Sequence, residues 1–116
     1  YNANPTSMQA SLEYFAALDV PNKVVILGDM AELGPDGPDE HRRIGEVAAA
    51  GRFAKVLLCG PLMQNAVAAN PLAYYFIDKF SLQNWMSDNR LENAHILIKG
   101  SRSMAMETVA ELLGSG

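Results

Sequence analysis

The stretch KVVILG, residues 23–28, decides the fold of this chain. Its apolar residues are consecutive and mostly β-branched, a pattern typical of a short strand that is buried on both faces. Comparable runs follow along the chain, namely KVLLCG at 55–60, AYYFID at 73–78 and HILIKG at 95–100. The sequence therefore predicts four buried strands, none of them half-solvated.

Helical periodicity fills the segments around these strands, since apolar residues recur there three or four positions apart. The predicted helices run around Met8–Ala16, around Ile44–Ala48, from Pro61 to Ala69, over Leu82–Met86 with Ser81 as N-cap, and from about Ser103 to Leu113. Regular alternation of helix and strand is typical of parallel strands joined by right-handed crossovers. We therefore predict a three-layer α/β fold with a mainly parallel sheet and helices on both of its faces.

Composition limits the possible functions. The chain has 116 residues, of which 49% are apolar, so we expect a single domain. Its nine Lys and Arg are scattered and are outnumbered by thirteen Asp and Glu, so a nucleic-acid partner is not expected. No apolar run approaches the roughly 20 residues that span a bilayer. The start, YNANPTS, does not resemble a signal peptide, so we expect a cytoplasmic protein without a membrane span.

Three of the segments that follow predicted strands carry more polar chemistry than a turn requires. They are YNANPTS at 1–7, which would follow a strand preceding the chain, GDMAELG at 28–34 and KGSRS at 99–103. Ligands of parallel α/β sheets bind beyond the carboxyl ends of the strands, where helix N-termini also point. These segments are therefore the candidate binding site.

The GDMAELG segment holds two carboxylates, Asp29 and Glu32. They could act as paired carboxylates, begin a helix, or bind a substrate ammonium group. His41 lies on the inward flank of the next helix, where we favour a packed, hydrogen-bonded histidine over a functional one. No His or Cys cluster at ligand spacing accompanies them, so no metal site is expected in this chain.

The other two segments each have a structural and a functional interpretation. Asn4 precedes Pro5 and suits a helix N-cap, but with Asn2 it could also bind a nucleotide or a carboxylate. Lys99 and Arg102 flank Ser101 at a helix entrance, where an anion would be stabilised; alternatively the serines cap the helix and the cations are solvated.

Recognisable catalytic motifs are missing. The sequence contains no phosphate-binding loop, no GxGxxG after a strand and no GxSxG elbow. Its single cysteine, Cys59, lies inside an apolar run and is expected to be a buried, unreactive thiol. The chain alone therefore does not contain a complete catalytic centre.

Three motifs together resemble the C-terminal domain of the Mur ligases: YNANPTSM, LGDMAELG followed by EH and IGE, and KGSRSMAMETV. They cover nearly the whole chain in the family's order and spacing. Within the family they are most similar to the branch that adds D-alanyl-D-alanine to UDP-N-acetylmuramoyl-tripeptide in peptidoglycan biosynthesis. Other Mur-type amino-acid ligases and polyglutamate synthases share the domain, but YNANP and GDMAELG fit them poorly.

The resemblance implies a longer, three-domain enzyme with an N-terminal domain for the UDP end, a central ATPase domain and this C-terminal domain. Residues 1–116 would form the C-terminal, Rossmann-like domain without its first strand, binding the incoming dipeptide and closing as a lid. ATP and Mg²⁺ would be bound mainly by the central domain. We expect the isolated domain to be inactive as a ligase.

The resemblance also assigns roles to individual residues. Tyr1, Asn2 and Asn4 match the motif that faces ATP and the acyl phosphate. The positions expected beside the dipeptide are Lys99, Ser101 and Arg102. In the pocket for the attacking amine, Asp29 and Glu32 would orient the amine and His41 would support them.

An alternative from a different class is a stand-alone flavodoxin-like or receiver-like binding module. Asp29, Asp78 and Lys99 imitate the acidic residues and distal lysine of a receiver only loosely.

Overall fold

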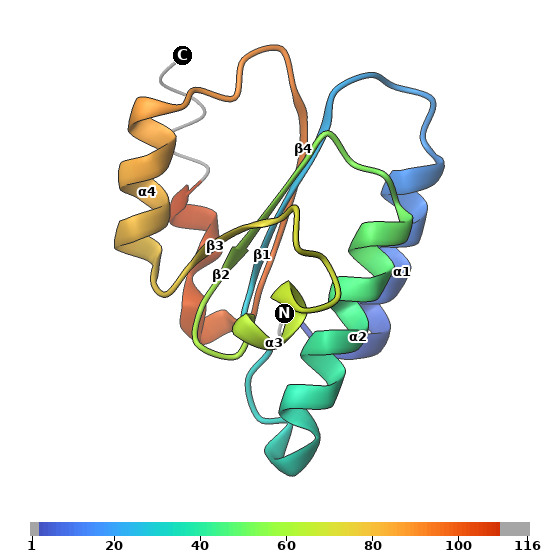
Figure 1. Ribbon diagram of the computed structural model, residues 1–116, viewed down its shortest axis with the longest axis vertical. Helices are drawn as coiled ribbons and strands as arrows, with labels where there is room; N and C mark the ends of the chain where they lie inside the picture. Colours follow the sequence, from blue (N-terminus) through green and yellow to red (C-terminus); the bar gives the residue numbers. More distant parts are fainter. Residues whose placement is uncertain (1–2, 110–116) are drawn as a thin grey trace.

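The computed structural model describes residues 3–109, and its helices and strands alternate as the sequence predicts (Figure 1). The strands are β1 (Lys23–Gly28), β2 (Lys55–Cys59), β3 (Tyr74–Phe76) and β4 (His95–Lys99). The α-helices are α1 (Pro5–Ala17), α2 (Gly37–Ala50), α3 (Gln64–Val67) and α4 (Lys79–Asp88). Short 3-10 helices are η1 (Gly34–Asp36), η2 (Arg102–Met104) and η3 (Met106–Val109).

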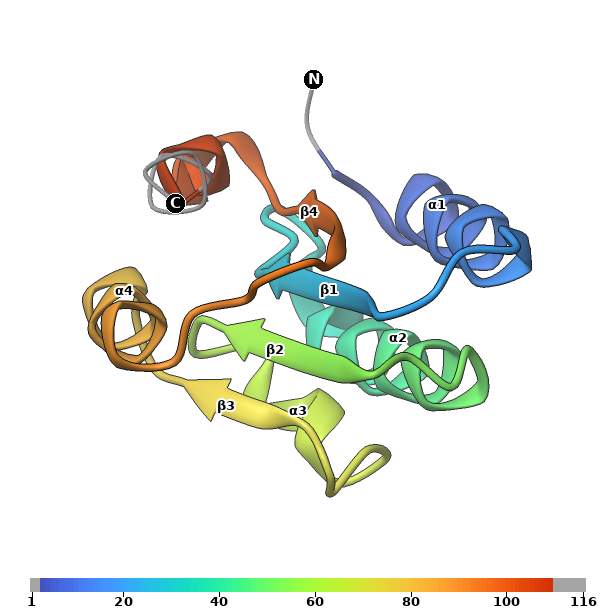
Figure 2. The same cartoon turned by 90° about the horizontal axis from the view of Figure 1, so that it is seen from above.

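The four strands form one parallel sheet in the order β3-β2-β1-β4. In the view along the sheet, α1, α2 and α3 cover one face, while α4 and the segment after β4 cover the other (Figure 2). The predicted α/β fold with a parallel sheet between two helical layers is therefore confirmed.

The face under α1, α2 and α3 holds the larger core. Alternate residues of β1 and β2 point to it and meet the apolar sides of the helices. Its buried members include Met8, Leu12, Val25, Leu27, Ile44, Leu58 and Met63. Asn4 begins α1 by accepting a 2.9 Å hydrogen bond from the Ser7 amide, in a capping box, so its predicted N-cap role is confirmed. The Lys23 ammonium donates to the carbonyls of Phe15, Ala16 and Leu18 where α1 ends.

The opposite face is packed by α4 and η3. Val24, Ile26, Leu57 and Cys59 supply the strand side of this core, and Leu82, Met86 and Met106 cover them. Helix α4 begins earlier than predicted. Its N-cap is Asp78 instead of Ser81, because the Asp78 carboxylate accepts a 2.8 Å hydrogen bond from the Ser81 amide.

Three further details differ from the sequence prediction. The strands β3 and β4 are the two edges of the sheet and are only partly buried, because one side of each has no neighbouring strand. Helix α3 is shorter than Pro61–Ala69. The described part of the predicted last helix consists of 3-10 turns, interrupted at Ala105 by a left-handed backbone with φ 47°. Its remaining predicted residues, 110–113, lie outside the described part of the chain.

Within residues 3–109, no helix has both the length and the apolar character needed to cross a membrane.

Candidate functional site at the carboxyl ends of the strands

The strand order reverses between β1 and β4, because the chain builds outward from β1 to β3 and then returns to the other side of β1. In parallel α/β sheets, such a switch point is where ligands bind beyond the strand ends. The segments that leave β1 and β4, which contain GDMAELG and KGSRS, therefore lie side by side at the lower end of the sheet in Figure 1. The structure thus brings two of the three predicted polar segments together.

Two glycines allow this close approach. A Cβ added to Gly100 would lie 2.7 Å from Met106 Cγ and 3.3 Å from Gly28 Cα, and one added to Gly28 would lie 2.9 Å from Met106. The Met106 side chain thus covers the neighbouring ends of both strands. Just beyond them, the Ser101 amide donates a 2.9 Å hydrogen bond to the Asp29 carbonyl, which joins the two segments.

The Asp29 carboxylate holds a third segment, the turn between β2 and α3. Its two oxygens accept hydrogen bonds from the backbone amides of Leu62 at 3.1 Å and Met63 at 2.9 Å, and the residue is only 8% exposed. Gly60 starts this turn with φ 119°, and any side chain there would collide with the carboxylate. Asp29 therefore connects β1, the β2–α3 turn and the β4 segment.

His41 fixes the next part of the same loop. It is fully buried; its Nε2 lies 2.9 Å from the Met30 amide and its Nδ1 lies 2.6 Å from the Gly37 carbonyl. A carbonyl only accepts and an amide N–H only donates, so the neutral ring carries its proton on Nδ1. The packed, hydrogen-bonded histidine that we favoured is confirmed, and it ties the β1 loop to the first turn of α2.

Glu32 has the opposite environment from Asp29. It is exposed and adopts φ 64°, a left-handed backbone that a non-glycine residue occupies at a cost. Gly34, two residues on, also has a positive φ of 59°. The two carboxylates therefore differ in role, since one is buried in the frame of the loop and the other is presented at its surface.

The KGSRS segment does not begin an α-helix. Ser101 is 2% exposed and precedes η2, without a side-chain cap hydrogen bond, and the side chain of Ser103 is outside the described part. The predicted α-helix start is therefore wrong, because a 3-10 turn follows Ser101, while anion binding by this segment stays a prediction. Lys99 is half-buried and Arg102 is exposed; each makes interactions of its own. Their placement at the switch point agrees with a binding role, which stays a prediction.

The first polar segment is described only from Ala3 onward. Tyr1 and Asn2 fall outside the described residues, so their predicted position toward ATP stays a prediction. The Asn4 side-chain oxygen is engaged in the α1 cap. Its assignment to the ATP side likewise stays a prediction.

Two residues behind Asp29 were not singled out by the sequence as part of the site. The Tyr75 hydroxyl donates a 2.9 Å hydrogen bond to the Gly60 carbonyl, and burial together with the nearby Asp29 raises the pKa of that hydroxyl. Cys59 is fully buried, and burial, followed by the charges of Asp29 and Asp78, raises its pKa to about 11. The expected burial of this thiol is thus confirmed, and its low reactivity stays a prediction. The sequence feature that could have predicted this turn is Gly60, because a glycine directly after β2 lets the Asp29 carboxylate come close to the backbone.

Among residues 3–109, no group of three or more His, Cys, Asp or Glu side chains could hold a metal ion.

Comparison with known proteins gives a consistent result. The model of the family described as "Mur ligase, glutamate ligase domain" matches residues 1–102. The UDP-N-acetylmuramoyl-tripeptide--D-alanyl-D-alanine ligase of Treponema pallidum is 35% identical over 97% of this chain and 26% of its own length. The ligase of the same name from Escherichia coli K12 is 37% identical over 97% of this chain and 25% of its own.

Solved structures agree with this similarity. A crystal structure of MurF from Acinetobacter baumannii superposes with a TM-score of 0.85 at 28% sequence identity, over 100% of this chain and 26% of that one. The chain therefore spans about a quarter of the length of the relatives that it matches. Because the family model covers most of its residues and the fold agrees, this chain belongs to the Mur ligase family, as its glutamate ligase (C-terminal) domain.

Proposed function

We propose that this chain is the substrate-binding and lid domain of a longer, three-domain ligase. That enzyme would use ATP to join D-alanyl-D-alanine to UDP-N-acetylmuramoyl-tripeptide in the cytoplasm, as a step of peptidoglycan biosynthesis. The observation that carries the proposal is the 35–37% identity to ligases of this name over 97% of the chain. The polar segments gathered at the switch point support it, because they form one side of a site that needs further residues.

In this proposal Glu32 contacts the incoming amine. An ammonium group cannot attack an activated carboxyl group until it loses a proton, and a nearby carboxylate can both orient it and accept that proton. Glu32 is exposed at the rim of the switch point, on a loop whose base is fixed by Asp29 and His41. Asp29 acts as a positioning residue, since its carboxylate oxygens are engaged by two backbone amides.

The remaining residues would bind the substrates. Lys99 and Arg102 suit the carboxylate of the dipeptide by charge, with Ser101 fixing their segment to Asp29. Tyr1, Asn2 and Asn4 would face ATP and the acyl phosphate. Residues 3–109 offer no metal-ligand cluster, so we assign Mg²⁺ and most of the ATP contacts to the rest of the protein.

The proposal is tested with the complete protein that contains this chain. We expect phosphate release that requires ATP, Mg²⁺, UDP-N-acetylmuramoyl-tripeptide and D-alanyl-D-alanine together, and a product whose mass increases by one dipeptide. Incorporation of glutamate or diaminopimelate in place of the dipeptide would contradict it. The 116-residue chain alone should release no phosphate.

The role of Glu32 is tested by Glu32→Gln in the same complete protein. Loss of the carboxylate should lower kcat/KM for the dipeptide by about 100-fold, the usual lower range for a general base. The matched control is Glu46→Gln, which removes an exposed carboxylate from the outer face of α2. Unchanged KM and kcat in Glu32→Gln would remove Glu32 from the mechanism and leave the ligase assignment intact.

A further inference from the structure

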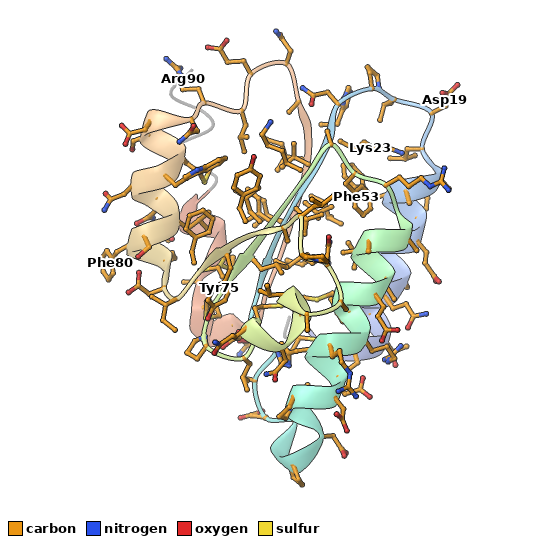
Figure 3. The ribbon with its side chains drawn as sticks, in the orientation of Figure 1. Asp19, Lys23, Phe53, Tyr75, Phe80 and Arg90 are labelled. Atoms are coloured by element: carbon orange, nitrogen blue, oxygen red, sulfur yellow. The ribbon has the colours of Figure 1, made fainter. Side chains whose placement is uncertain are left out.

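The opposite end of the sheet contains a hollow that the proposed ligase site does not use. It has a volume of about 430 Å³ and lies where α2 ends and where β2 and β3 begin. Phe53, one of its lining residues, marks this end of the molecule, away from the loop that follows β1 (Figure 3). A volume of this size is sufficient for a small organic molecule.

An amide side chain that bonds to no other described residue lines this hollow. Asn70 is 8% exposed, and its backbone is fully engaged with Ala66, Val67 and Ala73. Its side chain makes no hydrogen bond within residues 3–109. Every fully buried side-chain nitrogen or oxygen in this part of the chain has a partner, so the polar atoms of Asn70 are not fully buried. The side-chain nitrogen and oxygen of Asn70 are therefore still reached by solvent, and the residue is part of the lining of the hollow. A ligand in the hollow can exchange a hydrogen bond between this amide and water for a direct one.

Two cations line the same hollow, Arg52 and Lys55. Neither makes an ion pair or a side-chain hydrogen bond in the described part of the chain. Lys23, which starts the neighbouring strand, provides the contrast, since its ammonium is engaged by three carbonyls at the end of α1. Lys55 occupies the corresponding place in β2 and has no such engagement.

The backbone at Arg52 gives no reason for an arginine. It has φ 53°, a left-handed conformation just after the end of α2, where glycine or asparagine is usual. The preceding Gly51 is required by packing, because a Cβ there would lie 2.5 Å from the Phe53 ring. A strained arginine beside an apolar hollow therefore suggests a function for its guanidinium group.

We propose that this hollow binds a small organic anion, a carboxylate or phosphate carried on an apolar body. Arg52 and Lys55 pair with the charge, Asn70 donates a hydrogen bond from its amide, and Phe53 and Pro71 contact the apolar part. The C-terminus of α2 lies beside the site, and its partial negative charge opposes an anion. We therefore expect a dissociation constant on the order of 1 mM.

The test is a titration of the ¹⁵N-labelled 116-residue chain with phenyl phosphate, followed by NMR chemical shifts. We expect saturable shifts at the Arg52 and Ala73 amides and at the Asn70 side-chain amide. Benzoate should shift the same amides. The tighter of the two ligands then shows whether the hollow prefers a carboxylate or a phosphate. Benzyl alcohol, which lacks the charge, and inorganic phosphate, which lacks the apolar body, should each bind at least tenfold more weakly.

Two variants identify the site. Arg52→Gly suits the left-handed backbone, so it should fold normally and weaken phenyl phosphate binding about tenfold. Asn70→Asp is nearly isosteric and should weaken it by a similar factor through charge repulsion. The matched control is Arg90→Gly, which removes an exposed arginine distant from the hollow and should leave binding unchanged.

Shifts confined to the GDMAELG and KGSRS segments would overturn the proposal, as would equal binding of benzyl alcohol or an unaltered affinity in Arg52→Gly. Because the hollow lies at the other end of the sheet from the switch point, these outcomes do not depend on the ligase assignment.

Discussion

The loop that follows β1 has an inner half, residues 28–30, and an outer half, residues 31–36, and the two are built differently. The inner half is buried, and Asp29 and Met30 are held by contacts to the β2–α3 turn, the β4 segment and His41. The outer half is mostly exposed and contains two positive φ angles, at Glu32 and Gly34. One short motif therefore contains both a frame and a presented surface.

This difference teaches how to interpret acidic residues in such a motif. Asp29 is buried, but its two oxygens already accept hydrogen bonds from backbone amides, so its burial does not indicate a role in the reaction. Glu32 is three residues away and is held in a backbone conformation that glycine would adopt more easily. Strain at an exposed acid is the stronger indication of function, and a satisfied buried acid is the stronger indication of structure.

The largest effect is expected from breaking the inner half with Asp29→Ala. The amides of Leu62 and Met63 would lose their acceptor, and that of Met63 is buried. We expect the free energy of unfolding to fall by about 3 kcal/mol, because unsatisfied buried donors and lost charge-assisted hydrogen bonds are costly. Urea denaturation followed by circular dichroism measures this change. Asp29→Asn, which keeps one acceptor oxygen, should lose less, and an equal loss in both variants would refute the hydrogen-bond explanation.

An intermediate effect is expected from alkaline pH, acting on Cys59 behind Asp29. Burial raises the pKa of Cys59 from its ordinary value of 9.0 to about 11, so the folded state keeps the proton after the unfolded state has lost it. The resulting stability is present below pH 9 and is lost as the pH rises through about 11. The unfolding free energy should fall by about 2 kcal/mol between these values.

Comparison with Cys59→Ala isolates this contribution from the other groups that titrate in the same range. The thiolate absorbance near 240 nm gives the pKa when the absorbance of Cys59→Ala is subtracted at each pH, because the four tyrosines ionise in the same range and absorb at the same wavelength. Asp29→Asn should lower that pKa, since the charge of Asp29 is the second cause of its rise. A thiol that titrates near pH 9 in the folded protein would show that the frame around Asp29 is open to water.

The smallest effect on stability is expected in the outer half, from Glu32→Gly. Glycine adopts φ 64° without steric cost, which offsets the greater freedom that it gives the unfolded chain. The free energy of unfolding should therefore change by no more than about 1 kcal/mol, measured by urea denaturation. A loss as large as that of Asp29→Ala would place Glu32 in the frame and remove the contrast between the two halves.

Periodicity in the sequence predicted much of the fold, because burial on both faces leaves a continuous apolar run in a strand. It predicted β1 and β2 accurately. It did not distinguish β3 and β4 as edge strands, because their residues are as apolar as those of the central strands. The N-cap of α4 was assigned to Ser81 instead of Asp78, since both residue types suit a cap and only the backbone geometry selects one. The predicted last helix has 3-10 turns in its described part.

The sequence predicted which residues belong to the candidate site, but it did not predict the contacts that they make. The sequence alone indicated the α/β class, the polar strand-end segments and the resemblance to the Mur ligases, because these depend on residue type and spacing along one chain. Only the tertiary structure decided that Asp29 binds the amides of Leu62 and Met63, that Met106 covers Gly28 and Gly100, and that Asn70 lines a hollow beside Arg52. Each of these contacts joins residues far apart in the sequence, or a side chain to a backbone group, and no local pattern encodes such a pairing.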